Sequence, residues 1–299
     1  MNSKLRIVLL VFFSALFIVS AVMLINQGLD YQSSKNDYEE ADSIVGWPDD
    51  FDQMIQDFLN SKETEPNHGT DVTEPPSTGS NTASGETTDA GTRPPIDIGN
   101  NTYEGDPYVA VLTDVLKLKD LQKRNKDVIG YIYIKDTDIK YPLLHYTDND
   151  RYLRSKWYDA SIYSTAGTIF MDCKNSPDYS DFNTIVYGHR MRNETMFGKL
   201  KYYKSKSYWQ EHQSVYIRTD EGVSRYDIYA AYEIATDGMT YQISFSDDAA
   251  KQAYIDFTLE SSVINTGIRP TVNDQILTLS TCSGNGYETR WIVQAVRVF

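Results

Sequence analysis

The chain has 299 residues, with 28 basic and 42 acidic side chains and a formal net charge of −14. The acidic excess lies in one part of the chain: residues 1–25 carry 2 basic and 0 acidic side chains, residues 26–105 carry 3 and 17, and residues 106–299 carry 23 and 25. No part carries the basic excess that phosphate neutralisation requires, so the composition argues against nucleic acid as a partner.

Residues 7–25 form an uncharged, mostly apolar run that is long enough to cross a bilayer as a helix. Lys4 and Arg6 precede the run and acidic residues follow it. This asymmetry predicts a single-pass protein of the cell membrane, with residues 1–6 in the cytoplasm and the rest of the chain outside. A cleaved signal peptide is the alternative. Its apolar region is usually shorter, about 7–15 residues, and ends at a small-residue site, so we favour an uncleaved signal anchor.

Two different segments follow the apolar run. Residues 26–60 are an acidic juxtamembrane segment, in which apolar side chains from Phe51 to Leu59 recur at helical spacing and predict a short amphipathic helix. Residues 61–105 are rich in Thr, Ser, Gly, Pro and acidic residues and contain no aromatic residue before Tyr103. Such a segment cannot bury enough apolar surface to offset ordering. We therefore expect a disordered linker that lets the following domain move relative to the membrane.

Residues 106–299 have the pattern of a folded domain. An amphipathic helix is expected over residues 109–121, followed by short β-branched and aromatic runs that turn residues separate. Candidate strands are 131–134, 139–141, 168–171, 184–187, 215–218, 226–234, 275–281 and 291–298, with helices expected over 195–203, 206–212 and 247–259. Many short strands with few long helices favour a closed or nearly closed barrel over a doubly wound sheet.

The segment 275–282 is an apolar strand that ends in Cys282, and the turn-forming residues 283–286 come next. Arg290 then begins a second apolar strand. A hairpin of this kind brings Arg290 back beside Cys282. A guanidinium near a thiol favours the thiolate and can donate hydrogen bonds to an oxyanion that forms on an attacked carbonyl.

Thiol chemistry on an amide also requires a proton carrier, because the leaving amine must be protonated. His189 follows the candidate strand 184–187, and Gly188 gives the backbone room to turn. Cysteine, histidine and arginine at three strand ends would form a nucleophile, an acid/base and an electrophile. On spacing alone, the alternative of a buried cysteine, a structural histidine and a solvated arginine is equally acceptable.

Other candidate sites have weaker support. Cys173 and Cys282 could form one disulfide, but that bond would block the nucleophile, and we expect Cys173 to pack in a strand. The acidic residues 172–181 could bind Ca²⁺, although a solvated loop is the simpler interpretation. His68, His145 and His212 belong to no metal-binding motif. We expect no metal and no cofactor.

Several motifs resemble those of sortases. The string Thr278-Leu-Ser-Thr-Cys282 followed by Arg290 resembles the sortase signature, and Tyr187-Gly-His-Arg-Met191 resembles the histidine motif of class B sortases. Weaker similarity runs through residues 125–131, 141–142 and 148–153, so the resemblance covers the whole of residues 106–299. Tyr131 stands where class B sortases commonly have Trp, and Arg190 where they often have Asn or His. Neither departure is expected to touch the chemistry.

The resemblance implies a mainly β fold: a closed seven- or eight-stranded barrel with an N-terminal helical extension and a helix between strands six and seven, here residues 247–259. It also implies a transpeptidase. Cys282 would attack the Thr carbonyl of a C-terminal sorting motif in an exported protein, His189 would carry protons, and Arg290 would hold the oxyanion or the substrate. The acceptor would be an amine of a lipid-linked peptidoglycan precursor or a pilin lysine.

The resemblance further implies that Asn149, Tyr187 and Ser280 line or support the substrate site. Two alternatives to a transpeptidase remain at this point. An exported thiol endopeptidase would use the same residues but resolve the thioester with water. A tethered binding module would have lost activity, and the retention of all three reactive side chains counts against it. Substrate specificity is expected to depend on residues 234–274, whose fold the sequence does not predict.

Overall fold

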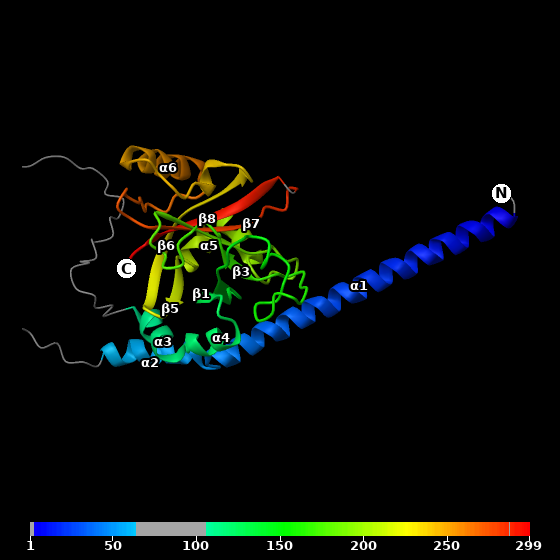
Figure 1. The fold of residues 1–299 in the computed structure, drawn as a ribbon, viewed down its shortest axis with the longest axis horizontal. Coiled ribbons are helices and arrows are strands. Elements are labelled where there is room, and N and C mark those ends of the chain that lie inside the picture. Colours follow the sequence, from blue (N-terminus) through cyan, green and yellow to red (C-terminus); the bar gives the residue numbers. More distant parts are fainter. Residues whose placement is uncertain (1–2, 64–105, 287) are drawn as a thin grey trace, which may run out of the picture.

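The computed structural model describes residues 3–63, 106–286 and 288–299. Helix α1 (Ser3–Val45) is one continuous helix that extends well past the expected span of residues 7–25 (Figure 1). From Leu9 onwards it is long and apolar enough to cross a membrane, and the most apolar part is not buried by any other element. Gly46 ends it at a φ of +81°, where Trp47 N bonds Asp42 O at 2.8 Å in a Schellman turn.

Three short helices cluster with the end of α1 at the foot of the barrel: α2 (Phe51–Glu63), α3 (Pro107–Val115) and α4 (Leu118–Arg124). The helix expected over 109–121 is therefore two helices. The break falls at Lys117, whose backbone N donates to Val45 O at 2.7 Å instead of continuing a helical ladder. Asp106 caps α3, since its carboxylate accepts from the N–H groups of Tyr108 and Val109.

The remainder is a closed barrel in the strand order β1-β2-β3-β4-β7-β8-β6-β5, which confirms the fold predicted from the sequence. Its eight strands within the described residues are β1 (Val128–Ile134), β2 (Lys140–Leu144), β3 (Ile169–Met171), β4 (Asn183–Tyr187), β5 (Ser214–Thr219), β6 (Gly222–Ala235), β7 (Ile276–Cys282) and β8 (Thr289–Arg297). Two neighbouring pairs, β2–β3 and β4–β7, are parallel, and the others are antiparallel. Alternate strand residues such as Ile132, Leu277 and Val293 fill the interior and are fully buried.

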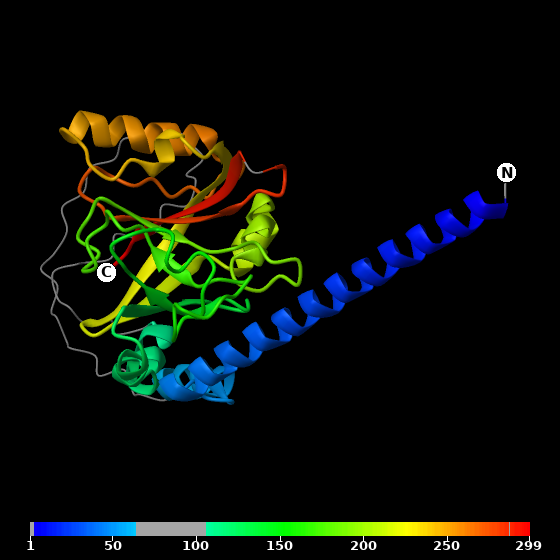
Figure 2. The same ribbon diagram turned by 45° about the vertical axis from the view of Figure 1, so that its right-hand side comes forward.

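Short helices connect some of the strands: η1 (Gly198–Lys204) and α5 (Lys206–Glu211) between β4 and β5, and η2 (Met239–Tyr241) between β6 and β7. The expected helix between the sixth and seventh strands is α6 (Asp248–Ser261), which begins at an N-cap formed by Asp247. It lies on the side of the barrel opposite α1 and α2 (Figure 2). Its face buries Tyr254 and Ile255 against β6 and β8.

The C-terminal part of α1 packs directly against the barrel. Ala41 and Val45 are fully buried in a cluster with Leu121 and Trp157. Helix α1 and the barrel are thus in contact. Of the linker expected over residues 61–105, residues 64–105 lie outside the described residues.

Candidate active site

Strands β4 and β7 bring two of the candidate residues to the same end of the barrel. The two strands are parallel, with Tyr187 opposite Ser280, and Gly188 N donates to Ser280 O at 3.2 Å. His189 and Cys282 each lie two residues beyond that pair, on adjacent chains running in the same direction. The parallel register therefore leads the backbone of both residues out of the same end of the barrel.

The third candidate lies on the other side of Cys282. Strands β7 and β8 are antiparallel, and Cys282 is the direct cross-strand partner of Arg290. His189 follows β4, Cys282 ends β7 and Arg290 lies at the start of β8, and these three strands are consecutive in the barrel. The β7–β8 turn lies on the side from which the N-terminal half of α1 extends (Figures 1 and 2).

The half-buried imidazole of His189 is held by the loop between β2 and β3. Its Nε2 lies 2.7 Å from the carbonyl oxygen of Leu153. A carbonyl only accepts, so Nε2 carries the hydrogen and Nδ1 is the basic nitrogen of the neutral ring. Burial lowers the pKa of His189, the Leu153 bond opposes that shift, and the positive charges of Arg154 and Arg290 lower it further. The neutral ring is therefore favoured at neutral pH.

Both cysteines are free thiols, and each is partly exposed. Cys173 lies in the turn after β3 rather than in a strand, which corrects the sequence-based expectation. Burial raises the pKa of Cys173, and the nearby negative charge of Asp172 raises it further. A thiolate is therefore disfavoured at Cys173.

The acidic residues 172–181 are engaged in local turns. Asp172 accepts hydrogen bonds from Asn149 and Tyr187, and Asp181 accepts from Asn175 and from the backbone N of Ser176. Across the described residues, no group of three or more His, Cys, Asp and Glu side chains is arranged to hold a metal ion. The carboxylates therefore act as acceptors that shape the loop beside β3 and β4.

The three residues expected to line or support the substrate site belong to polar networks next to the cysteine. Asn149 Nδ2 and the Tyr187 hydroxyl both donate to Asp172, at 3.0 and 2.8 Å. Ser280 is 2 % exposed, and its hydroxyl lies 2.9 Å from that of Tyr241. Ser280 is thus positioned to support neighbouring side chains from within the barrel wall rather than to contact a substrate.

A cavity of about 290 Å³ opens beside Arg290. Of the three residues expected to line or support the substrate site, only Tyr187 lies on the wall of this cavity. Its lining comprises Asp172, Lys174, Tyr187, Thr236, Tyr241, Ile243 and Arg290. The rings of Tyr187 and Tyr241 are stacked, with centroids 6.4 Å apart.

Sequence reasoning missed two contributors to this region. Tyr241 comes from η2, in the part of the chain whose fold the sequence did not predict, so no sequence signal pointed to it. Arg190 was noted only as a departure from the family pattern. Its guanidinium donates to the backbone carbonyl of Ser283, which ties the turn after His189 to the turn after Cys282. The sequence did hold a signal for this contact, because Arg190 directly follows the candidate histidine at the end of a strand.

Comparisons with known proteins identify the family of this domain. A family model described as a sortase domain matches residues 132–298. Sortase B of Listeria monocytogenes is 36 % identical over 168 residues, which is 56 % of this chain and 67 % of that protein. Sortase B of Staphylococcus aureus is 33 % identical over 173 residues, covering 58 % of this chain and 70 % of the relative.

Solved structures give the same result. A Staphylococcus aureus sortase B–substrate complex superposes with a TM-score of 0.57 at 32 % identity, over 60 % of this chain and 83 % of that chain. Clostridium perfringens sortase B also has a TM-score of 0.57, at 29 % identity, over 60 % of this chain and 99 % of that chain. The barrel and the matched domain together define a cysteine transpeptidase of the sortase class. The chain belongs to the sortase B family.

Proposed function

We propose that this enzyme cleaves a C-terminal sorting motif of exported proteins at the Thr carbonyl and transfers the acyl group to an amine of a lipid-linked peptidoglycan precursor. The observation that supports the proposal is the register of the consecutive strands β4, β7 and β8: His189 follows the end of β4, Cys282 ends β7, and Arg290 lies opposite Cys282 at the start of β8. A nucleophile, a proton carrier and a cation in one place are the set that acyl transfer requires.

In this mechanism His189 accepts the thiol proton of Cys282, and the sulfur attacks the carbonyl carbon. Arg290 stabilises the negative charge that develops on the carbonyl oxygen. The C–N bond then breaks, His189 gives its proton to the leaving amine, and a thioester remains on Cys282. An incoming amine loses a proton to His189 and attacks the thioester, and that proton returns to the sulfur.

The cavity beside Arg290 is proposed to hold the sorting motif. Tyr187 and Tyr241 form an aromatic wall there. Asn149 and Ser280 act behind that wall, Asn149 through Asp172 and Ser280 through the hydroxyl of Tyr241. Backbone and side-chain contacts in such a groove orient the scissile bond toward the thiol.

We propose the same membrane arrangement as the sequence predicts. Residues 1–6 are cytoplasmic, 7–25 span the cell membrane once, 26–60 are juxtamembrane, 61–105 are a linker, and 106–299 form the catalytic domain on the extracellular face. The apolar, unburied surface of the first half of α1 supports a membrane anchor.

The decisive experiment incubates the purified chain with a library of fluorogenic sorting peptides, with and without an added amine. Cys282→Ala should abolish cleavage, and Cys173→Ala is the matched control that should retain it.

The products of the reaction distinguish the candidate functions. A new amide product in the presence of amine supports transfer, whereas only the free acid would indicate a thiol endopeptidase. Retained cleavage by Cys282→Ala would refute the assignment. An absence of both cleavage and peptide thioester on the wild-type chain would favour an inactive binding module.

A further inference from the structure

The β2–β3 loop (residues 145–168) lies directly against the ring of His189. The Leu153 carbonyl is the hydrogen-bond partner of Nε2 at 2.7 Å. On the other arm of the loop, Gly167 has a φ of +56°, and a Cβ built there would lie 3.0 Å from His189 Cδ2 and 2.3 Å from Leu153 O. A methyl group at position 167 would therefore clash with the Leu153 carbonyl and press against the imidazole, so the loop leaves no room for one.

Helix α1 binds the first arm of this loop, which contains Leu153 and residues 156–158. Asp37 accepts from Lys156 Nζ at 2.9 Å and from the Tyr158 hydroxyl at 3.2 Å. The backbone carbonyl of Asp37 also accepts from Trp157 Nε1 at 3.0 Å, and Trp157 is fully buried. Three consecutive loop residues are thus bound to one position of α1.

The second arm of the loop, which contains Ser164 and Gly167, is also bound by α1. The Tyr38 hydroxyl donates to the Gly167 carbonyl at 2.8 Å. The hydroxyls of Ser34 and Ser164 are 3.3 Å apart in a buried contact. Gly167 therefore has α1 on one side and His189 on the other.

The two arms are bonded to each other, so they move together. Thr168 N donates to Tyr152 O and Ser164 N donates to Arg154 O, both at 3.0 Å. Because Tyr152 and Arg154 flank Leu153, a shift of either arm displaces the carbonyl that binds His189.

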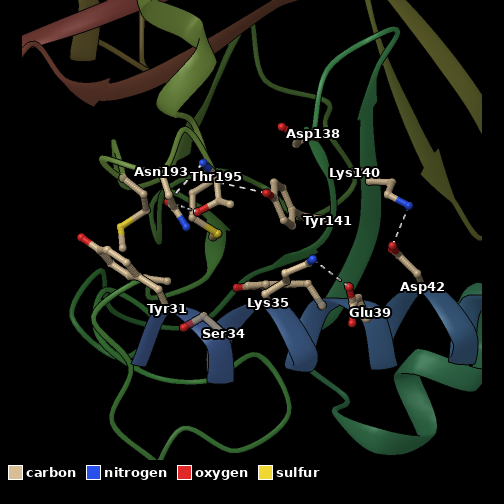
Figure 3. A pocket seen from close by; sticks show the side chains of 14 residues that line it. Tyr31, Ser34, Lys35, Glu39, Asp42, Asp138, Lys140, Tyr141, Asn193 and Thr195 are labelled. Atoms are coloured by element: carbon tan, nitrogen blue, oxygen red, sulfur yellow. Dashed lines mark hydrogen bonds and ion pairs between the residues drawn. The ribbon is translucent and has the colours of Figure 1, made fainter. Parts of the chain in front are cut away.

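Beyond this contact, α1 touches the barrel at a separate place. Asp42 forms an ion pair with Lys140 at 2.7 Å and accepts from the Tyr131 hydroxyl. A cavity of about 330 Å³ lies between the two contacts, and Figure 3 shows it between α1 and the strand that carries Lys140 and Tyr141. The loop contact and the Asp42 contact can therefore be changed independently.

We propose that α1 orients the catalytic imidazole: Asp37 and Tyr38 are positioning residues that hold the β2–β3 loop, and the loop holds His189. This inference rests on the proposed role of His189. It makes turnover dependent on a helix that touches neither the thiol nor the cavity beside Arg290. Loss of orientation by about 1 Å can lower a rate by about 100-fold, whereas substrate binding in a separate cavity should change little.

The test uses the full-length chain in detergent or nanodiscs, with the variants Tyr38→Phe, Asp37→Asn and the double variant. Cleavage of a sorting peptide gives kcat and KM, and NMR titration of His189 gives its pKa. In the double variant we expect kcat to fall about 10- to 100-fold with KM within about twofold. We also expect the pKa of His189 to rise. Release of the loop exposes the ring and moves the charge of Arg154 away, and the exposure, which reverses the largest cause of the lowered pKa, outweighs the loss of the Leu153 hydrogen bond.

Asp42→Asn is the matched control, because it weakens the other contact of α1 while leaving the loop contacts in place. It should lower thermal stability yet preserve kcat and the titration of His189. Wild-type kcat and His189 titration in the folded double variant would overturn the inference. If the double variant does not fold, Tyr38→Phe alone decides the question by the same two measurements. Retained turnover in His189→Ala would instead refute the proposed role of His189, which separates the two failures.

Discussion

Tyr187 and Ser280 face each other across the parallel β4–β7 pair, and each is two residues before a reactive side chain. Because the strands are parallel, both lead out of the same end of the barrel, where the antiparallel strand β8 begins. One pairing register therefore brings together His189 and Cys282, which are far apart along the chain.

Arg290→Lys should lower kcat/KM for peptide cleavage by about 100-fold, because an ammonium keeps the charge but loses the planar fork that can bind an oxyanion. Arg297→Lys is the matched control. It changes the same residue type on the same strand, but Arg297 bonds Gln275 and Ser224 instead of facing the thiol. Steady-state kinetics measure both variants. Equal losses of activity would show that the effect comes from the strand rather than the site.

Gly167→Ala should cost about 1–2 kcal/mol from the left-handed backbone and more from the clash, and it should abolish turnover. Gly267→Ala separates the two contributions, since Gly267 also has positive φ, +81°, but no atom lies near its Cβ direction. Thermal unfolding and peptide cleavage should be measured together. An active Gly167→Ala enzyme would contradict the close fit of the loop around His189.

Arg154→Gln should raise the pKa of His189. Burial is the largest cause of the lowered pKa, and the charge of Arg154 adds to it. The ring of the variant should therefore become protonated at a higher pH than the ring of the wild type. NMR titration of the imidazole measures the midpoint. Arg192→Gln, an exposed position just past the histidine, should leave the midpoint unchanged.

The same lowered pKa predicts how stability depends on pH. A histidine whose folded-state pKa is depressed binds fewer protons in the folded than in the unfolded chain. Its contribution to stability is complete above the unfolded-state pKa and declines as pH falls through the folded-state pKa. His189→Gln should remove that decline, and denaturant unfolding at several pH values would detect it. An unchanged pH dependence would contradict the assigned direction of the shift.

Tyr241→Phe should destabilise the fold by about 1–2 kcal/mol, because it leaves the buried hydroxyl of Ser280 without its partner. It should also raise KM, since Tyr241 lines the cavity beside Arg290. Tyr208→Phe is the control, because the buried hydroxyl of Tyr208 has no hydrogen-bond partner among the described residues. Denaturant unfolding measures the stability of both variants, and steady-state kinetics measure their KM. If Tyr208→Phe is the more destabilising, the hydrogen-bond argument is wrong.

Sequence patterns predicted the strands because short β-branched and aromatic runs are separated by turn residues. The hairpin between Cys282 and Arg290 was also predictable, since one short turn joins its strands. The neighbourhood of His189 was harder to predict. It depends on β4 pairing in parallel with β7, a long-range choice that local propensity does not encode.

Two features could not be predicted from local patterns. The sequence predicts a juxtamembrane segment after Ile25 but not that this segment continues α1, because a helix with one packed face tolerates polar residues on the others. Tyr241 reaches the site through a 3-10 turn in an irregular connection, and no periodicity marks such a turn. Both depend on tertiary packing.

The uninterrupted course of α1 has a consequence for the cargo. Thirteen residues separate Ile25 from Tyr38, which corresponds to about 20 Å of helix. With residues 7–25 in the bilayer as proposed, the contact between Tyr38 and the β2–β3 loop lies at most about 20 Å above the hydrocarbon. A substrate held in the same membrane would then require about six extended residues to span that height.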